Sequence, residues 1–364
     1  MSEIIEVSFI EKYQLMITFY PGPSKVYPQV AKYMQNAFEE GILSINHRSA
    51  ECMEITKSAI QLLHEKLNIP KDYSIYFVSS ATEAWEIIAQ SLTSQKTTHF
   101  YNGAFGEKWA DYSSKIVKQT DRIPFSLTEN PSVNLALNAE VEVLCLTQNE
   151  TSNGTQIKDF SPFRKTFSES IIAIDVTSSL GGIELDWENG DVWFASVQKC
   201  LGLPAGMGIM ICSPKALAKA EQINDRKYYN SLLFMQENFA KFQTHYTPNV
   251  LSIYLLQKVL SDISNISVIS EKIKRQAKDW YDFFNSSDKF GLNCLVQNIE
   301  IQSDTVIAVQ GSELQVKAIK ERTKIAGITL GNGYGTWKNT TFRIANFPAI
   351  EPFEISKLKE ILQS

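Results

Sequence analysis

The amino-acid sequence predicts an α/β protein with a mostly parallel central sheet in a large domain and a smaller α+β domain after it. Short apolar runs alternate with helical patterns from Ser74 to Cys212, which is typical of parallel strands joined by helices. The chain has 364 residues, enough for two domains. We expect an N-terminal arm over residues 1–18, the large domain over 19–258 and the small domain over 259–364.

The composition argues against several classes of protein. Hydrophobic residues make up 44% and charged residues 21%, as in ordinary globular proteins. A net charge of −5 disfavours nucleic acid as the main partner, and no apolar run approaches the ~20 residues of a membrane span. The N-terminus lacks the pattern of a secretory signal. Five scattered cysteines and four histidines without ligand spacing predict reduced thiols in a cytoplasm and no metal site.

The elements of the first half follow from apolar spacing and turn residues. Pro21-Gly22-Pro23 is a turn, and Pro70 ends the second expected helix. Apolar residues at helical spacing predict helices, and short continuous apolar runs predict buried strands. The expected helices are 30–40, 50–67 and 84–94, and the expected strands are 74–78, 98–101 and 141–147.

The second half continues in the same way and then changes character. Strands are expected over 171–175, 192–195 and 209–212, followed by a helix over 214–223. A long helix from residue 250 should cross to the small domain, with a further helical stretch over 270–285. The small domain should contain strands 305–309 and 341–345 and helices 312–326 and 351–362.

Lys199 and Asp175 are the two residues that point to chemistry. Lys199 lies between two expected strands beside a glycine-rich turn, where burial would lower the pKa of its amine, as a Schiff-base amine requires. Asp175 ends a strand, where functional groups gather in open α/β sheets, although such an Asp is often only a turn or cap residue. Pyridoxal phosphate needs one lysine and one acid for its ring nitrogen.

Several segments carry a resemblance to a known family. The runs DVTSSLGG (175–182), SVQKCLGLPAG (196–206) and FYPGPSKVYP (19–28) resemble the class V, fold-type I pyridoxal-phosphate-dependent aminotransferases. SINHRSAE (44–51) is similar to the phosphoserine aminotransferases, whereas the Ser-Leu-Gly-Gly and Leu-Pro-Ala-Gly runs are more similar to the alanine/serine–glyoxylate branch. The resemblance extends from about Phe19 to the final helix. It implies pyridoxal 5′-phosphate as cofactor and a homodimer with shared active sites.

The resemblance also implies a role for each candidate residue. Lys199 would hold the cofactor and move the substrate's α-proton, and Asp175 would keep the ring nitrogen protonated. The other implied cofactor contacts are Ser80, Ala81, Thr82, Phe105, which would stack on the ring, Thr151, Gln198 and, from the neighbouring subunit, Thr247. The implied substrate-binding residues are His47 and Arg48, also from the neighbour, and Arg343, which would clamp the α-carboxylate.

Most of these residues also have a purely structural interpretation, which the sequence leaves open. The alternatives are a helix cap for Thr82 and for Thr247-Pro248, core packing for Phe105, a polar turn for Thr151, a solvated loop for His47-Arg48, and an internal salt bridge for Arg343.

Two positions depart from the phosphoserine aminotransferase pattern. The family places an arginine and a His-Arg pair around the substrate phosphate. In this sequence Glu83 aligns near that arginine, and Thr336-Trp337 align near that pair. Each lost charge-assisted hydrogen bond removes ~1.5–3 kcal/mol. Lys338 could compensate, although the sequence does not place it.

We therefore expect a phosphoserine:2-oxoglutarate aminotransferase of serine biosynthesis, with amino-acid and 2-oxo-acid substrates. The alternative is a serine/alanine–glyoxylate or pyruvate aminotransferase of the same class. A non-catalytic binding protein with this fold is less expected, because Lys199, Asp175 and Arg343 are all present. A nucleotide-dependent oxidoreductase is disfavoured, because no G-x-G-x-x-G follows an early strand.

Overall fold

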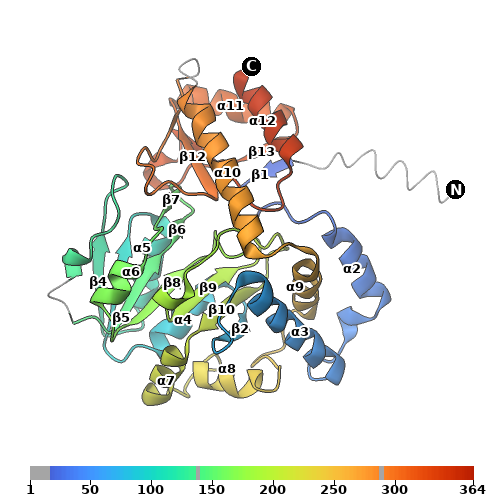
Figure 1. The fold of residues 1–364 in the computed structure, drawn as a ribbon, viewed down its shortest axis with the longest axis vertical. Helices are drawn as coiled ribbons and strands as arrows, with labels where there is room; N and C mark the ends of the chain where they lie inside the picture. The colour runs from blue at the N-terminus through green and yellow to red at the C-terminus, as the bar shows by residue number, and fades with distance from the viewer. Residues whose placement is uncertain (1–16, 137–139, 287–290) are drawn as a thin grey trace.

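The computed structural model describes residues 17–136, 140–286 and 291–364 (Figure 1). It contains a seven-stranded sheet, a five-stranded sheet and a two-stranded hairpin. The predicted N-terminal arm lies outside the described residues except for Ile17 and Thr18, which belong to strand β1 (Ile17–Phe19). The domain boundaries at residues 18 and 258 stay a prediction.

The seven-stranded sheet forms the centre of the large lobe. Its order is β2-β10-β9-β8-β5-β3-β4, and only β10 runs antiparallel to its neighbours. The predicted mostly parallel sheet is therefore confirmed. The strands are β2 (Ser74–Val78), β3 (Lys96–Tyr101), β4 (Gln119–Pro124), β5 (Val143–Thr147), β8 (Ile171–Asp175), β9 (Val192–Ser196) and β10 (Gly208–Cys212).

The carboxyl ends of the central parallel strands bring polar residues together. Strand β5 ends at Thr147, which pairs in register with Asp175 at the end of β8. Asp175 in turn pairs with Phe194, two residues before the end of β9. Strands β5, β8 and β9 are buried along their whole length, so these polar ends mark one edge of an otherwise apolar layer.

The helices of the large lobe agree only in part with those expected from the apolar spacing. Helix α4 begins three residues earlier than expected, because the Ser80 hydroxyl accepts a hydrogen bond from the Glu83 N–H and caps the helix at that point. Helices α5, α6 and α8 were not predicted, and the buried face of α5 includes Trp109 and Ala110. The helices are α2 (Val30–Glu39), η1 (Ile42–Ser44), α3 (Ala50–Leu67), α4 (Ala81–Ser91), α5 (Ala104–Ser113), η2 (Val133–Ala136), α6 (Ser161–Thr166), η3 (Trp187–Asn189), α7 (Pro214–Ile223), α8 (Leu232–Phe239) and α9 (Val250–Asp262).

The expected long helix from residue 250 is in fact two helices. Helix α9 ends at Asp262, because Ile263 and Asn265 have extended backbone conformations, and α10 (Ile266–Asn285) begins after them. The first turns of α10 pack in the core of the large lobe, whereas Trp280 and Phe284 pack in the core of the small lobe. Helix α10, orange in Figure 1, therefore joins the two cores.

The small lobe is built on the five-stranded sheet, in the order β1-β13-β14-β12-β11. Strand β1 pairs in parallel with β13, so the first described residues belong to the C-terminal sheet. No helix in the described part is long and apolar enough to cross a bilayer. The remaining elements are the hairpin strands β6 (Asn149–Glu150) and β7 (Thr155–Gln156), and β11 (Asn293–Cys294), β12 (Val306–Gln310), α11 (Glu313–Ile325), β13 (Ile328–Asn332), η4 (Gly335–Trp337), β14 (Thr341–Ala345) and α12 (Pro352–Gln363).

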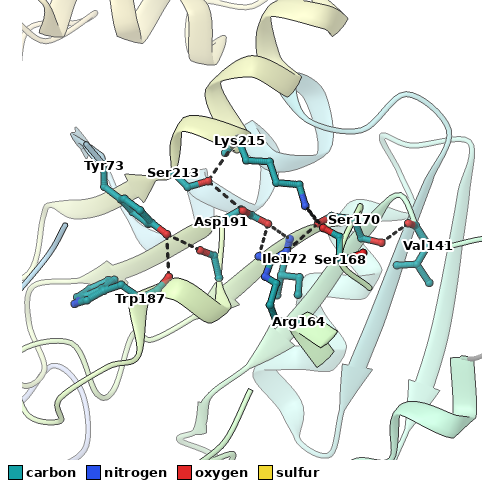
Figure 2. Close-up of polar contacts among 12 residues, drawn as sticks. Tyr73, Val141, Arg164, Ser168, Ser170, Ile172, Trp187, Asp191, Ser213 and Lys215 are labelled. Atoms are coloured by element: carbon teal, nitrogen blue, oxygen red, sulfur yellow. Dashed lines mark hydrogen bonds and ion pairs between the residues drawn. The ribbon is translucent and has the colours of Figure 1, made fainter. Parts of the chain in front are cut away.

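A polar network around the buried Asp191 lies at the amino ends of β8 and β9, opposite the end that carries the cavity (Figure 2). The Asp191 carboxylate accepts hydrogen bonds from Arg164 at 2.6 Å, from the Ile172 N–H at 2.9 Å and from the Ser213 hydroxyl at 3.1 Å. Lys215 donates to the carbonyl of Ser170 at 2.8 Å. This network supports the sheet and lies at the end of the strands away from Asp175.

Candidate active site

A cavity of about 350 Å³ opens at the carboxyl edge of the large sheet. A volume of this size is in the range of small-molecule sites. Lys199 and Asp175 both line it, so the two residues singled out in the sequence face one space. The lining residues are Gly22, Pro23, Ala81, Thr82, Trp85, Phe105, Lys108, Tyr112, Thr147, Asn149, Thr151, Asp175, Thr177, Ser196, Gln198 and Lys199.

The turn that carries Lys199 is held by the segment that follows β1. The Gln198 carbonyl accepts a hydrogen bond from the Ser24 N–H at 3.0 Å, and the Gly202 carbonyl accepts one from the Tyr27 N–H at 2.9 Å. A Cβ atom at Gly22 would lie 2.4 Å from Cε of Lys199, so only glycine leaves room for the lysine side chain. Two segments far apart in the sequence therefore shape the surroundings of one amine.

Lys199 is buried, with 7% of its surface exposed. Its Nζ lies 3.4 Å from the Thr151 hydroxyl oxygen, to which it donates, and 5.7 Å from the centre of the Phe105 ring. Burial first, and then the positive charge of Arg343, lower the pKa of the Lys199 amine to about 8. A substantial fraction of the amine is therefore neutral near pH 8.

Asp175 is buried at the end of β8, where its Oδ1 accepts a hydrogen bond from the Thr177 N–H at 2.8 Å. Burial raises the pKa of its carboxyl to about 6, although hydrogen bonding from Thr177 acts in the opposite direction. The carboxylate of Glu150 adds to the increase, and the charge of Lys199 reduces it. Asp175 is therefore ionised above about pH 6.

Phe105 is fixed by a buried carboxylate that the sequence interpretation did not single out. The Glu150 side chain accepts hydrogen bonds from the N–H groups of Phe105 and Gly106, each at 3.2 Å, at the start of α5. A Cβ atom at Gly103 would lie 2.3 Å from Cγ of Glu150, so this contact requires glycine. Glu150 follows Asn149 in the quoted Asn-Glu-Thr loop, and that motif was the available signal.

The turn before α4 supplies Ala81 and Thr82 to the cavity. Ser80, not Thr82, caps the helix, so the capping alternative for Thr82 is wrong. Ser80 does not line this cavity. The Ala81 N–H donates to the Ser196 hydroxyl oxygen at 2.9 Å, and the exposed Thr82 hydroxyl makes no hydrogen bond to the described residues. A helix N-terminus at this place favours an anion.

Glu83 is directed away from the cavity and is already paired. Its carboxylate accepts hydrogen bonds from the Ser79 N–H at 2.6 Å and from the Tyr229 hydroxyl at 2.8 Å. The side chain is buried and does not line the cavity. The acidic residue at this position therefore has a structural role.

Arg343 lies beside the cavity, behind Thr151, and is not among the lining residues. Its Nη1 donates to the Thr151 carbonyl at 2.6 Å and its Nε to the Asn332 carbonyl at 2.7 Å. Among the described residues it forms no ion pair with a carboxylate, so the internal salt bridge weighed from the sequence is not found there. Burial lowers the pKa of its guanidinium.

The residues expected from a neighbouring subunit lie elsewhere on this chain. His47 and Thr247 line a separate surface cavity of about 370 Å³, and Arg48 is exposed on the same loop as His47. Thr247-Pro248 do not begin a helix: α9 is capped by Asn249, whose side chain accepts from the Ser252 N–H. That structural alternative is therefore wrong.

Comparison with known proteins places the chain in a family. A sequence model of the family described as Aminotransferase class-V matches residues 17–339. A phosphoserine aminotransferase from Rhodococcus opacus (strain B4) is 25% identical over 348 residues, 93% of this chain and 91% of the relative. The crystal structure of a phosphoserine aminotransferase from Cytophaga hutchinsonii has a TM-score of 0.91 and 32% identity, covering 96% of this chain and 98% of that one.

A second solved structure resembles the chain in fold. An alanine–glyoxylate aminotransferase from Nostoc sp. has a TM-score of 0.83 and 20% identity, covering 96% of this chain and 94% of that one. The family match extends over most of the chain, and the Cytophaga hutchinsonii protein is similar along nearly the whole length of both chains. The large mostly parallel sheet and the small C-terminal lobe are the fold-type I architecture that the sequence predicted. This chain belongs to the class V aminotransferase family.

Proposed function

We propose that this protein is a pyridoxal-phosphate-dependent aminotransferase that transfers the amino group of phosphoserine to 2-oxoglutarate. The observation that carries the proposal is the shared cavity of Lys199 and Asp175, in which burial lowers the pKa of the amine and raises that of the acid. The phosphorylated substrate is supported by the likeness to the Cytophaga hutchinsonii phosphoserine aminotransferase. A place in serine biosynthesis, in the cytoplasm, belongs to the same proposal.

The groups around the cavity fit pyridoxal phosphate. Lys199 would hold its aldehyde carbon, Asp175 its ring nitrogen and Phe105 one face of its ring. Ala81 and Thr82 at the start of α4, with Gln198, would hold the phosphate. The Thr147 hydroxyl is buried, lines the cavity and has no partner among the described residues, so a polar atom is available to a ligand.

When bound, the cofactor supplies an electron sink for the charge left by removal of the substrate's α-proton. The side chains divide the remaining tasks. Lys199, with a pKa of about 8, can accept and return the proton of the α-carbon, and the Thr151 hydroxyl orients its Nζ. Asp175, ionised above about pH 6, keeps a proton on the ring nitrogen.

Arg343 would orient the substrate's α-carboxylate. A guanidinium has five N–H donors, and the carbonyls of Thr151 and Asn332 use two of those of Arg343. The remaining donors are available to a carboxylate, which a guanidinium binds through two parallel hydrogen bonds.

We also propose a homodimer in which His47, Arg48 and Thr247 complete the site of the neighbour. In support, His47 and Thr247 share one surface cavity away from Lys199. Exposed apolar side chains lie on the adjoining segments, notably Phe38 on α2 and Leu43 on η1. If sedimentation equilibrium shows a monomer and the same sample is fully active, this arrangement is excluded.

A serine/alanine–glyoxylate or pyruvate aminotransferase is the second candidate. The observation that favours it is the engagement of Glu83 in structural hydrogen bonds, together with the absence of positive charge at Thr336 and Trp337. Without those cations, a phosphate group would be held by fewer partners.

Steady-state kinetics of the purified holoenzyme distinguishes the candidates. We expect kcat/KM for phosphoserine with 2-oxoglutarate to exceed that for serine or alanine by at least on the order of 100-fold, the effect of one to two charge-assisted hydrogen bonds. The same donors are then compared with glyoxylate and pyruvate as acceptors. A preference for serine or alanine with glyoxylate would replace the first proposal with the second, and no turnover with any pair would favour a non-catalytic protein.

A further inference from the structure

Lys108 is a cation at the cavity that none of the roles above uses. It lies on α5, three residues after Phe105, and lines the same cavity as Lys199. Its Nζ donates to the hydroxyl of Tyr334 at 2.5 Å. Tyr334 precedes η4 in the small lobe, so this hydrogen bond joins the two lobes beside the cavity.

The partners of Lys108 leave its charge available to an anion. Among the described residues it forms no ion pair. Its Nζ lies 5.7 Å from the ring centre of Phe105 and 5.2 Å from that of Tyr334. Aromatic faces and one neutral hydroxyl hold an ammonium in place without neutralising it.

Lys108 and Arg343 lie against the same aromatic ring. The Cζ atom of Arg343 is 5.7 Å from the ring centre of Tyr334, and the rings of Tyr334 and Phe105 are themselves in contact at 5.6 Å. If Arg343 holds the α-carboxylate of a substrate, Lys108 is a second cation on the same side of the site. Two cations arranged in this way match a substrate with an anion at each end.

Apart from His47 and Arg48, which are proposed to come from the neighbouring subunit, the other positions weighed for this task do not supply a cation to the cavity. Glu83 is acidic, Thr336 and Trp337 are uncharged, and the exposed Lys338 does not line the cavity. Among the lining residues, the positive charges are those of Lys108 and Lys199, and Lys199 is assigned to the cofactor.

We propose that Lys108, oriented by the Tyr334 hydroxyl, binds the distal anionic group of the substrate: the phosphate of phosphoserine and, with the second substrate, the far carboxylate of 2-oxoglutarate. The proposal rests on the proposed function, because a substrate such as alanine has no distal anion. It replaces within this chain the cations missing near Glu83 and Thr336-Trp337.

Calorimetric titration of the holoenzyme with two non-reacting ligands tests the proposal. 3-Phosphoglycerate and glycerate differ only in the phosphate and lack the amino group needed for turnover. In Lys108→Met we expect binding of 3-phosphoglycerate to weaken about 10- to 100-fold, the effect of one charge-assisted hydrogen bond, with binding of glycerate unchanged. Lys108→Arg should stay within a few-fold of wild type, since it keeps the charge.

Two further variants refine the test. Lys118→Met removes an exposed lysine that donates to Gln95 beyond the end of α5, and it should bind both ligands as wild type does. Tyr334→Phe keeps the ring but removes the hydroxyl that positions Lys108. We therefore expect its affinity for 3-phosphoglycerate to fall a few-fold, with its affinity for glycerate unchanged. In steady-state kinetics, the same variant should have a higher KM for phosphoserine and an unchanged kcat.

The outcomes separate this proposal from the proposed function. If wild type prefers 3-phosphoglycerate and Lys108→Met keeps that preference, the role of Lys108 is overturned while the substrate assignment stands. If wild type binds both ligands equally, the phosphorylated substrate is wrong and the role of Lys108 falls with it. If Lys108→Met weakens uptake of pyridoxal phosphate by the apo-protein instead, the lysine serves the cofactor's phosphate and the proposal is overturned.

Discussion

Lys199 and Asp175 are both buried where burial disfavours their charged forms. The pKa of Lys199 is lowered to about 8 and that of Asp175 is raised to about 6, so between these pH values both groups are charged at a cost to the fold. Strained electrostatics of this kind is typical of sites arranged for a ligand rather than for stability. The apo-protein should therefore become more stable when one of these groups is neutralised.

Asp175→Asn in the apo-protein tests this cost. The folded pKa of about 6 lies above the ordinary 3.8, so the folded state binds more protons than the unfolded state between these values and wild type loses stability as pH rises through that window. Two pKa units correspond to at most about 3 kcal/mol, a net figure that already includes the attraction to Lys199. In urea unfolding, the gain of the variant should grow from pH 4 to pH 6 and then level off. A variant no more stable than wild type at pH 7 would contradict the argument.

At the residue scale, the sequence predicted the residues whose motifs are contiguous. One cavity is lined by Lys199 and Asp175 and by five further residues from these motifs: Ala81, Thr82, Phe105, Thr151 and Gln198. The sequence could not predict contacts made only in space. Gly22 packs on Lys199 from a segment far away in the chain, and Lys108 meets Tyr334 across the two lobes. The sequence shows that Glu83 is acidic, but it could not show that the Tyr229 hydroxyl donates a hydrogen bond to its carboxylate.

At the scale of elements, the two ends of the strands in the large sheet have different roles. The carboxyl ends of β5, β8 and β9 carry the cavity, and the amino ends of β8 and β9 carry the network of Asp191 (Figure 2). Asp191 joins Arg164, the start of β8 and the residue after β10 through hydrogen bonds to one carboxylate. The network should therefore contribute to stability without contributing to catalysis.

Asp191→Asn tests that division. It removes the charge that pairs with Arg164 at 2.6 Å in a largely buried place, so we expect a loss of about 3 kcal/mol in the free energy of unfolding. The matched control is Asp282→Asn, which breaks an exposed ion pair with Lys278 at 2.5 Å and should cost less than about 0.5 kcal/mol. Urea unfolding measures both. Equal losses in the two variants, or a lower kcat in the folded Asp191→Asn enzyme, would contradict this role.

The elements that the sequence predicted well are those with strong, uninterrupted patterns. Strand β8 and helix α7 have the expected bounds, because an apolar run and a Ser-Pro start are unambiguous. Strand β4 was missed because QTDRIP is a half-exposed edge strand without an apolar run. The break between α9 and α10 was missed because the residues of the break, Ile263-Ser264-Asn265, interrupt helical spacing only briefly.

At the scale of the whole molecule, the beginning of the chain connects the small lobe to the lysine turn. Strand β1 adds to the sheet of the small lobe through β13, and within a few residues Gly22 contacts Lys199. Pro21, which lies between β1 and Gly22 in the chain, packs against Gly331 of β13. A Cβ atom at Gly331 would lie 2.5 Å from Cδ of Pro21. The sequence predicted two lobes but not this connection, because a three-residue strand with a neighbour at residue 328 carries no local signal.

We propose that the cavity at the carboxyl ends of the large sheet's strands holds pyridoxal phosphate on the amine of Lys199. Reduction of the holoprotein with borohydride, followed by peptide mapping with mass spectrometry, tests it most directly, since the reduced link survives proteolysis. We expect one pyridoxyl group per chain, on Lys199, and the same site of labelling in Asp175→Asn. A label on another lysine, or a protein that takes up no cofactor under these conditions, would contradict the claim.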